Sequence, residues 1–293
     1  MTRPLNIAHR GARSLAPENT LAAARAALAV GADMWELDVS LTADAELVVL
    51  HDDTLVRTTN VEQLFPERNP WLISEFTLTE IKRLDTGGPF VAKDPFEQLG
   101  AGQLSKADIE SLSGEPIPTL REALLFTRNH NWRVNVEIKP LLPPRHTFPL
   151  ADRVAALISE LAMDEQVLVS SFVPMYLKQI KERSPAIETA VLTEGPMPLG
   201  EQQKYEQLGI ELSPLLYFDG TEPVSFLAAL GSKTYHPYYA MLADTDIKGL
   251  RQAGLEVNLW TVNDRTHMAR LVNSGVSGII TDFPQVLSQV RGV

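Results

Sequence analysis

Short apolar runs alternate with longer Ala/Leu-rich segments along the chain, and this alternation predicts strands joined by helices. The runs expected to form strands are Leu5–Ala8, Met34–Asp38, Val134–Ile138, Val167–Ser170, Glu188–Leu192, Lys233–His236, Glu256–Trp260 and Gly278–Ile280. The helical patterns between them are Thr20–Val30, Leu120–Asn129, Ala151–Met163, Met175–Lys181, Thr245–Ala253 and Arg265–Asn273. Eight strands alternating with helices in this way favour an α/β fold of the (β/α)₈ TIM-barrel type over an open sheet.

The alternation breaks once, between the apolar run Leu47–Leu50 and the helix for which Thr119 is the expected N-cap. The break is punctuated by Gly87-Gly88-Pro89, Lys93-Asp94-Pro95 and Gly100-Ala101-Gly102. We expect residues 52–116 to form an insertion subdomain after the second strand, inside a single barrel domain that spans 1–293. Connections longer than about 12–15 residues are commonly lids or binding elements, so the insertion is expected to face the substrate.

Composition and charge narrow the classes of protein that the chain can represent. With 44% hydrophobic and 22% charged residues it matches ordinary globular proteins. A formal net charge of −11 argues against nucleic-acid or anionic-membrane partners, and the absence of cysteine excludes disulfides, thiolate chemistry and Cys-based zinc sites. No signal-peptide h-region and no membrane-spanning apolar stretch are evident, so we expect a cytoplasmic protein without stable membrane insertion. The oligomeric state is left open.

The first strand ends in His9-Arg10-Gly11, which places an imidazole and a guanidinium together at a strand's C-terminal end. Arginine offers a planar fork suited to phosphate oxygens, and histidine transfers protons readily near neutral pH. By itself this tripeptide is also compatible with a structural histidine.

Carboxylates recur at every second position on two of the predicted strands. Glu36 and Asp38 share one face of the second strand, and Glu137 and Lys139 share one face of the third. In a barrel that face is the interior, where charges need partners. The pattern indicates either a hard divalent cation such as Mg²⁺ or Ca²⁺, or a salt-bridge network with Arg10 and Lys139.

His51-Asp52-Asp53 follows the run Leu47–Leu50 and supplies a second imidazole near the predicted barrel mouth. Two histidines can divide the acid and base roles: one activates the attacking oxygen and the other protonates the leaving alkoxide. A cation, Arg10 and Lys139 would then neutralise the phosphoryl charge.

The chain resembles the glycerophosphodiester phosphodiesterases over nearly its whole length. The matching motifs are His9-Arg10-Gly11, Pro17-Glu18-Asn19-Thr20, Glu36-Leu37-Asp38-Val39, His51-Asp52, Arg57-Thr58-Thr59-Asn60, Leu84-Asp85-Thr86-Gly87, Ile117-Pro118-Thr119-Leu120, Glu137-Ile138-Lys139, Trp260-Thr261-Val262-Asn263 and Thr281-Asp282-Phe283-Pro284. The resemblance implies a TIM barrel with an insertion after the second strand. It also implies hydrolysis of a small-molecule glycerophosphodiester to glycerol 3-phosphate and an alcohol, a reaction of glycerol and lipid metabolism.

The same resemblance implies roles at the matching positions. These are an acid–base pair (His9 and His51), ligands of one divalent cation, Mg²⁺ or Ca²⁺ (Glu36, Asp38 and Glu137), and phosphate contacts (Arg10 and Lys139). Trp260 could stack on the glycerol unit, and Glu18 could contact substrate. Either Asn19 or Thr20 is expected to cap a helix, and Asp282 could be a turn residue.

Three other functions are compatible with these residues. A lysophospholipase D type activity would need an apolar groove, for which the insertion offers Trp71, Phe76, Phe90 and Phe96. A non-catalytic phosphopolyol-binding protein is disfavoured by the cost of burying so many ionisable groups. A metal-dependent aldolase or lyase leaves the paired histidines less well explained. His236 could line the pocket, whereas His130, His146 and His267 are expected on loops or helix surfaces.

Overall fold

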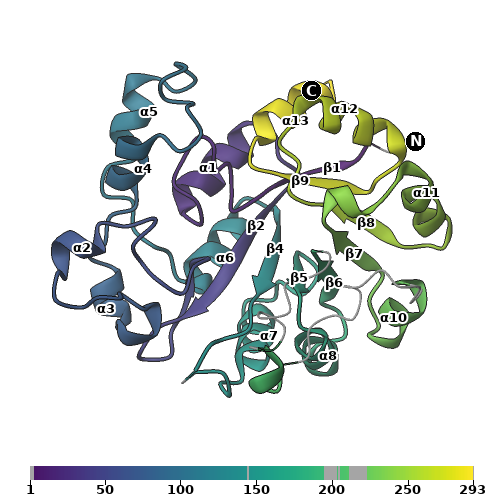
Figure 1. Ribbon diagram of the computed structural model, residues 1–293, viewed down its shortest axis with the longest axis horizontal. Coiled ribbons are helices and arrows are strands. Elements are labelled where there is room, and N and C mark those ends of the chain that lie inside the picture. The colour runs from purple at the N-terminus through teal and green to yellow at the C-terminus, as the bar shows by residue number, and fades with distance from the viewer. Residues whose placement is uncertain (1–2, 144, 195–202, 204, 211–222, 293) are drawn as a thin grey trace.

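The computed structural model describes residues 3–143, 145–194, 203, 205–210 and 223–292. Eight parallel strands form the barrel: β1 (Leu5–Ala8), β2 (Met34–Leu41), β4 (Arg133–Ile138), β5 (Val167–Ser171), β6 (Glu188–Thr193), β7 (Thr234–Pro237), β8 (Glu256–Leu259) and β9 (Gly278–Thr281). β1 pairs with both β2 and β9, which closes the barrel (Figure 1). The predicted TIM barrel is therefore confirmed.

Helices cover the outside of the barrel. They are α1 (Leu21–Ala29), α6 (Leu120–Asn129), α7 (Leu150–Glu160), α8 (Pro174–Arg183), α10 (Pro223–Ala229), α11 (Asp244–Gln252), α12 (Arg265–Ser274) and α13 (Pro284–Val290). The sequence pattern indicates six of these and misses the short helices α10 and α13. The expected N-caps are confirmed at Thr20, which accepts a bond from the Ala23 amide, and at Thr119, which forms a capping box with Glu122.

Alternation along the strands points every second side chain outward, toward the helices, and the others into the barrel. Trp35 points outward, where it stacks on Trp132 with ring centroids 6.3 Å apart and donates a hydrogen bond to Thr127. On the opposite face of β2, Met34 packs with Ile7 and Ile280. This apolar group lies one layer below Glu36, so the carboxylates of β2 lie toward the C-terminal end of the barrel.

The segment after β2 contains a ninth strand that the sequence pattern does not assign. β3 (Leu47–Val49) pairs antiparallel with β2, with Val39 opposite Val49. β2 itself continues to Leu41, beyond the predicted end of the second strand at Asp38. A tight turn joins the two strands: the Thr42 hydroxyl accepts a bond from the Glu46 amide. The hairpin delivers His51 back to the C-terminal end of the barrel.

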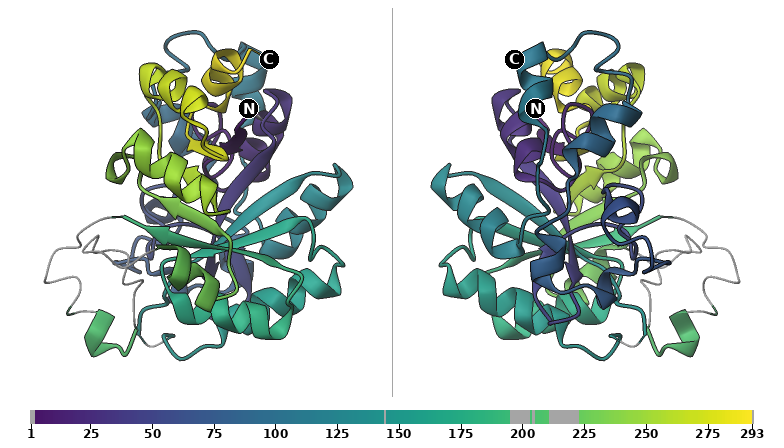
Figure 2. Two further views of the ribbon diagram at one scale, coloured as in Figure 1. Left: turned by 90° about the vertical axis from the view of Figure 1, so that its right-hand side faces the viewer. Right: turned by 90° about the vertical axis from the view of Figure 1, so that its left-hand side faces the viewer.

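Between β3 and α6 lie five short helical segments. They are α2 (Val61–Leu64), η1 (Ile73–Glu75), α3 (Leu78–Ile81), α4 (Gly87–Lys93) and α5 (Lys106–Ser111). They bury a cluster of their own around Leu55, Phe76 and Ile81. A Cβ atom at Gly87 would lie 1.6 Å from the Leu112 carbonyl, so only glycine fits there. In the right-hand view of Figure 2 these blue helices face the viewer on one side of the barrel.

The described helices are too short or too polar to cross a membrane.

Candidate active site

A pocket of about 350 Å³ opens at the C-terminal ends of the barrel strands, the end at which TIM barrels carry their active sites. Its lining residues are His9, Arg10, Glu36, His51, Asn135, Glu137, Lys139, Phe172, Leu192, Glu194, Trp260, Thr261 and Ile280. Most of the candidate site residues are therefore brought together. Asp38 lies just beneath the lining and is almost completely buried. Glu18 does not line this pocket and faces a smaller neighbouring cavity.

Three carboxylates converge on one side of the pocket. One oxygen each from Glu36, Asp38 and Glu137 lies within 4.8 Å of the others. The register of the barrel produces this convergence, because Asp38 on β2 pairs directly with Glu137 on β4. Oxygen-only ligand sets of this kind suit hard divalent cations.

The partners of these carboxylates distinguish a cation site from a complete salt-bridge network. Asp38 has three partners, Arg10 Nε at 3.2 Å, Lys139 Nζ at 3.0 Å and the Asn19 amide at 2.8 Å. Glu36, in contrast, accepts one bond from the Arg10 backbone amide at 2.7 Å, and its Oε1 atom is buried without a hydrogen-bond partner among the described residues. Such a buried, unpartnered oxygen fits a metal ligand.

The electrostatics agree with a missing positive charge. Burial, with the neighbouring Asp38 and Glu137 charges, raises the pKa of Glu36 well above its ordinary value. Burial and Asp38 likewise raise the pKa of Glu137 against the opposing effect of Lys139. Although burial opposes its ionisation, Lys139 and Arg10 hold the pKa of Asp38 well below its usual range. A divalent cation at this cluster would favour the ionised form of all three carboxylates.

Among the described residues, the ionic groups of the carboxylate cluster and of the ion pairs that connect it with the two histidines carry an excess of two negative charges when the carboxylates are ionised and the histidines neutral. The cations are Arg10, Arg13, Arg57 and Lys139, and the carboxylates are Glu18, Glu36, Asp38, Asp52, Glu137 and Asp282. One divalent cation would balance this set.

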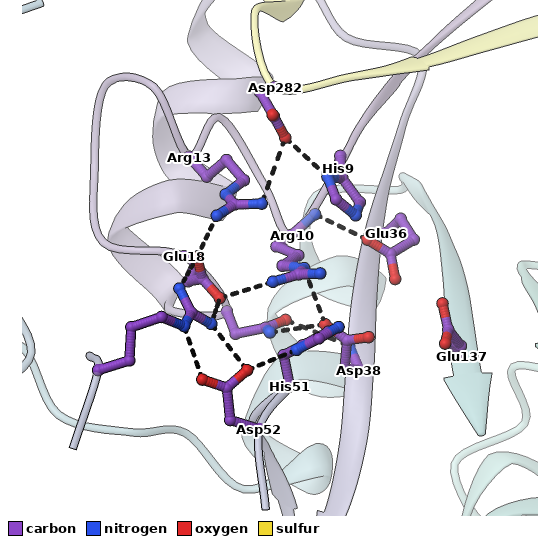
Figure 3. Close-up of polar contacts among 12 residues, drawn as sticks. His9, Arg10, Arg13, Glu18, Glu36, Asp38, His51, Asp52, Glu137 and Asp282 are labelled. Atoms are coloured by element: carbon purple, nitrogen blue, oxygen red, sulfur yellow. Dashed lines mark hydrogen bonds and ion pairs between the residues drawn. The ribbon is translucent and has the colours of Figure 1, made fainter. Parts of the chain in front are cut away.

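His9 is held by a carboxylate from the last strand of the barrel. Its Nδ1 atom lies 2.7 Å from Asp282 Oδ1 (Figure 3). Asp282 Oδ2 accepts a hydrogen bond of 2.7 Å from Asn263. This arrangement leaves Nε2 for the pocket. Burial, aided by Arg10, lowers the pKa of His9 despite Asp282, so the neutral ring is favoured near neutral pH.

His51 is held in a similar way but from the insertion side. Its Nδ1 atom lies 2.6 Å from Asp52 Oδ1, and the other oxygen of Asp52 accepts a bond of 2.6 Å from Arg57 Nε. Burial opposes ionisation of Asp52, but His51 and Arg57 hold the pKa of this carboxyl well below its usual range. Each imidazole thus has an aspartate that fixes its orientation.

Backbone geometry positions Arg10 between the two histidines (Figure 3). Arg10 has a φ of 56° and Gly11 a φ of 77°, a left-handed conformation that favours glycine. A Cβ atom at Gly11 would lie 2.6 Å from the Ala23 Cβ atom, so α1 packs directly on this turn. The Arg10 guanidinium donates to Glu18 Oε1 at 2.9 Å and pairs with Asp38 Oδ2 at 3.2 Å, and these two partners hold it in place.

Trp260 follows β8 and forms an aromatic wall of the pocket. Its indole N–H donates to the His236 carbonyl at 2.8 Å, and its ring packs edge-on against Phe172 and Tyr238 with centroids 5.7 Å apart in both pairs. The sequence pattern places Trp260 inside the strand, but β8 ends at Leu259 and Trp260 is free to face the pocket.

Five residues of the site are not identified as functional by the sequence analysis. Asp282 is considered there only as a turn residue, yet it is buried against His9. Asp52, Arg57 and Arg13 receive no role, although Asp52, Arg57 and Asp282 all belong to the matching motifs. Asn19, one of the expected caps, bonds to Asp38 instead. Their charges and motif positions are the signals that could have identified them.

Only some of the aromatic residues of the insertion pack inside it. Phe76 is buried against Phe65, and the Trp71 indole donates to the Phe65 carbonyl. Phe90 and Phe96 line the smaller cavity beside Glu18. They do not belong to the lining of the pocket that holds the two histidines.

His236 is buried inside the barrel and does not line the pocket. Its Nε2 accepts a hydrogen bond of 2.9 Å from the Asn258 amide. His130, His146 and His267 are exposed, as expected.

Stability should depend on pH through His236, because burial lowers the pKa of this residue from 6.5 to about 3. The unfolded chain takes up the proton below about pH 6.5 whereas the native protein does not, so stability falls as the pH drops from 6.5 toward 3, by about 1.4 kcal/mol per pH unit. Urea unfolding at pH 7.5 and pH 5.5 measures this slope, which His236→Gln should reduce. An unchanged slope in the variant would contradict the prediction.

Comparisons with known proteins agree with this geometry. Residues 9–286 match the Glycerophosphoryl diester phosphodiesterase family. A glycerophosphodiester phosphodiesterase of Caldanaerobacter subterraneus subsp. tengcongensis is 32% identical over 97% of this chain and 96% of its own length.

Two solved structures share the fold. A glycerophosphodiester phosphodiesterase from Agrobacterium tumefaciens superposes with a TM-score of 0.69 at 26% identity, covering 99% of this chain and 100% of the other. An Oleispira antarctica phosphodiesterase, solved in complex with the product sn-glycerol-3-phosphate, gives a TM-score of 0.67 at 25% identity, covering 98% of this chain and 96% of the other. The chain therefore belongs to the glycerophosphoryl diester phosphodiesterase family of phosphodiester hydrolases.

Proposed function

We propose that this protein hydrolyses glycerophosphodiesters to glycerol 3-phosphate and an alcohol, using one divalent cation, Mg²⁺ or Ca²⁺. The observation that carries the proposal is the composition of the pocket. Two imidazoles, each oriented by an aspartate, share it with a cluster of three carboxylates, in which Glu36 has a buried oxygen without a hydrogen-bond partner among the described residues. The relatives named above support the same substrate class.

In this proposal the two histidines divide proton transfer. His9 accepts the proton of the attacking oxygen, because its neutral ring presents Nε2 to the pocket while Asp282 holds Nδ1. His51 donates a proton to the leaving alkoxide. The attacking oxygen belongs either to water or to the neighbouring hydroxyl of the glycerol unit.

Glu36, Asp38 and Glu137 would hold the cation, which supplies Lewis-acid polarisation of the phosphoryl group when bound. Arg10 and Lys139 are the proposed phosphate contacts. Asp38 already holds both side chains, Arg10 at 3.2 Å and Lys139 at 3.0 Å. Little reorganisation of these side chains is therefore needed when the phosphate group enters.

The aromatic wall at Trp260 is the proposed surface for the glycerol unit, with Phe172 beside it. Glu18 as a direct substrate contact stays a prediction. We treat residues 52–116 as an insertion subdomain within a single barrel domain over 1–293. Roles in glycerol and lipid metabolism and a cytoplasmic location also stay predictions from the sequence.

The proposal is tested by release of glycerol 3-phosphate in a coupled assay on a panel of glycerophosphodiesters. Metal-stripped protein should show background release, and addition of Mg²⁺ or Ca²⁺ should restore it. Lysophosphatidylcholine in the same panel tests the lysophospholipase D alternative. Substrate binding without turnover in any arm would instead support a phosphopolyol-binding protein.

A further inference from the structure

One continuous chain of hydrogen bonds and ion pairs joins the two histidines across the site (Figure 3). From His51 it runs through Asp52, Arg57, Glu18, Arg13 and Asp282 to His9. Glu18 lies at the middle of this chain. The residues on its two sides come from different parts of the protein, the insertion on one side and the first and last strands on the other.

The contacts of Glu18 are short and saturate its carboxylate. Arg57 donates to both oxygens, at 2.8 Å and 2.6 Å, and Arg13 lies 2.6 Å from Oε2. Arg10 adds a fourth contact at 2.9 Å. The side chain is only 8% exposed, so these charge-assisted bonds are shielded from solvent.

Each outer arginine also binds the aspartate that orients one histidine. Arg57 contacts both oxygens of Asp52, at 2.6 Å and 3.0 Å. Arg13 Nη1 lies 3.6 Å from Asp282 Oδ1, the oxygen that also contacts His9. A change in the charge at Glu18 therefore reaches both rings through one arginine and one aspartate each.

We propose that Glu18 is a positioning residue that couples the orientation of His9 and His51 and fixes Arg10 between them. This inference rests on the proposed function for its catalytic consequence, but the coupling is a property of the chain's own contacts. Glu18 acts through its three arginines and does not touch the reacting atoms.

The test uses ¹⁵N NMR of the histidine side chains in the full-length protein with Mg²⁺ present. The His9 and His51 signals among the six histidines are assigned from His9→Gln and His51→Gln. Glu18→Gln keeps the size of the side chain and removes its charge, so it is expected to shift both signals although Glu18 contacts neither ring. Turnover should fall by about 10–100-fold, the usual effect of losing an orienting partner.

Glu115→Gln is the matched control. Glu115 is 10% exposed, pairs with Arg25 at 3.2 Å and lies outside the ion-pair chain. This variant should leave both histidine signals and the turnover unchanged. If Glu18→Gln fails to fold, Arg57→Gln replaces it, because Arg57 is 43% exposed and should shift the His51 signal strongly and the His9 signal measurably.

The inference is overturned if Glu18→Gln, or Arg57→Gln in its place, shifts only one histidine signal or neither. Failure of the proposed function looks different: no glycerophosphodiester is hydrolysed by the wild type, whereas both signals still respond to the loss of the Glu18 charge.

Discussion

Alanine at His9 or at His51 is expected to lower the rate constant for hydrolysis by about 10²–10⁴-fold, the usual contribution of a positioned acid or base. Each ring lines the pocket and is oriented by its own aspartate, at 2.7 Å and 2.6 Å. The fold should survive both changes, because neither side chain belongs to an apolar core cluster. The measurement is kcat from the glycerol 3-phosphate assay, with circular dichroism to confirm folding.

The double variant separates paired action from independent action. If His9 and His51 serve one proton-transfer cycle, the second substitution costs much less than the first. His267→Ala is the control, because this histidine is exposed on α12 and should have wild-type turnover. Near-normal activity in both single variants would rule out the acid–base assignment.

Glu137→Gln and Glu36→Gln are expected to weaken divalent-cation binding and to reduce turnover to near the level of chelated protein. Glutamine preserves the shape of either side chain but removes the charge that the cation needs. Calorimetric titration with Mg²⁺ or Ca²⁺ measures the binding directly. In the wild type the ion should also stabilise the fold, by about 2.7 kcal/mol at a concentration of 100 times Kd.

Glu194→Gln provides the matched comparison, since Glu194 lines the same pocket but lies outside the carboxylate cluster. It should bind the ion like the wild type. A wild type that takes up no ion, or a Glu137→Gln variant with unchanged affinity, would favour the salt-bridge network as the sole role of these carboxylates.

The barrel could be predicted because its strands repeat one simple pattern. On β2 the alternation placed Trp35 and Leu37 outside and Glu36 and Asp38 inside, as the structure confirms. The strand β3 was not predicted because three residues carry too little periodicity, and because its pairing with β2 depends on the turn at Thr42. The helix α13 was not predicted either, because it is also short.

The candidate site was predictable where a single segment carries the chemistry, and less so where segments meet. Motifs identified His9, His51 and the carboxylates one by one. The neutral state of the His9 ring and the unpartnered oxygen of Glu36 depend on burial, which no local pattern encodes. Glu18 illustrates the same limit, since its three arginine partners come from separate positions and are assembled only by folding.

The hydrogen bond between His9 and Asp282 joins residues near the two ends of the chain, and β1 is hydrogen-bonded along its length to β9. During synthesis the amino-terminal part leaves the ribosome first. His9 therefore has no partner until Asp282, 273 positions later, has been translated and has left the ribosome. A nascent chain that ends before Asp282 would lack an oriented His9, so catalytic competence should appear only after this residue has emerged.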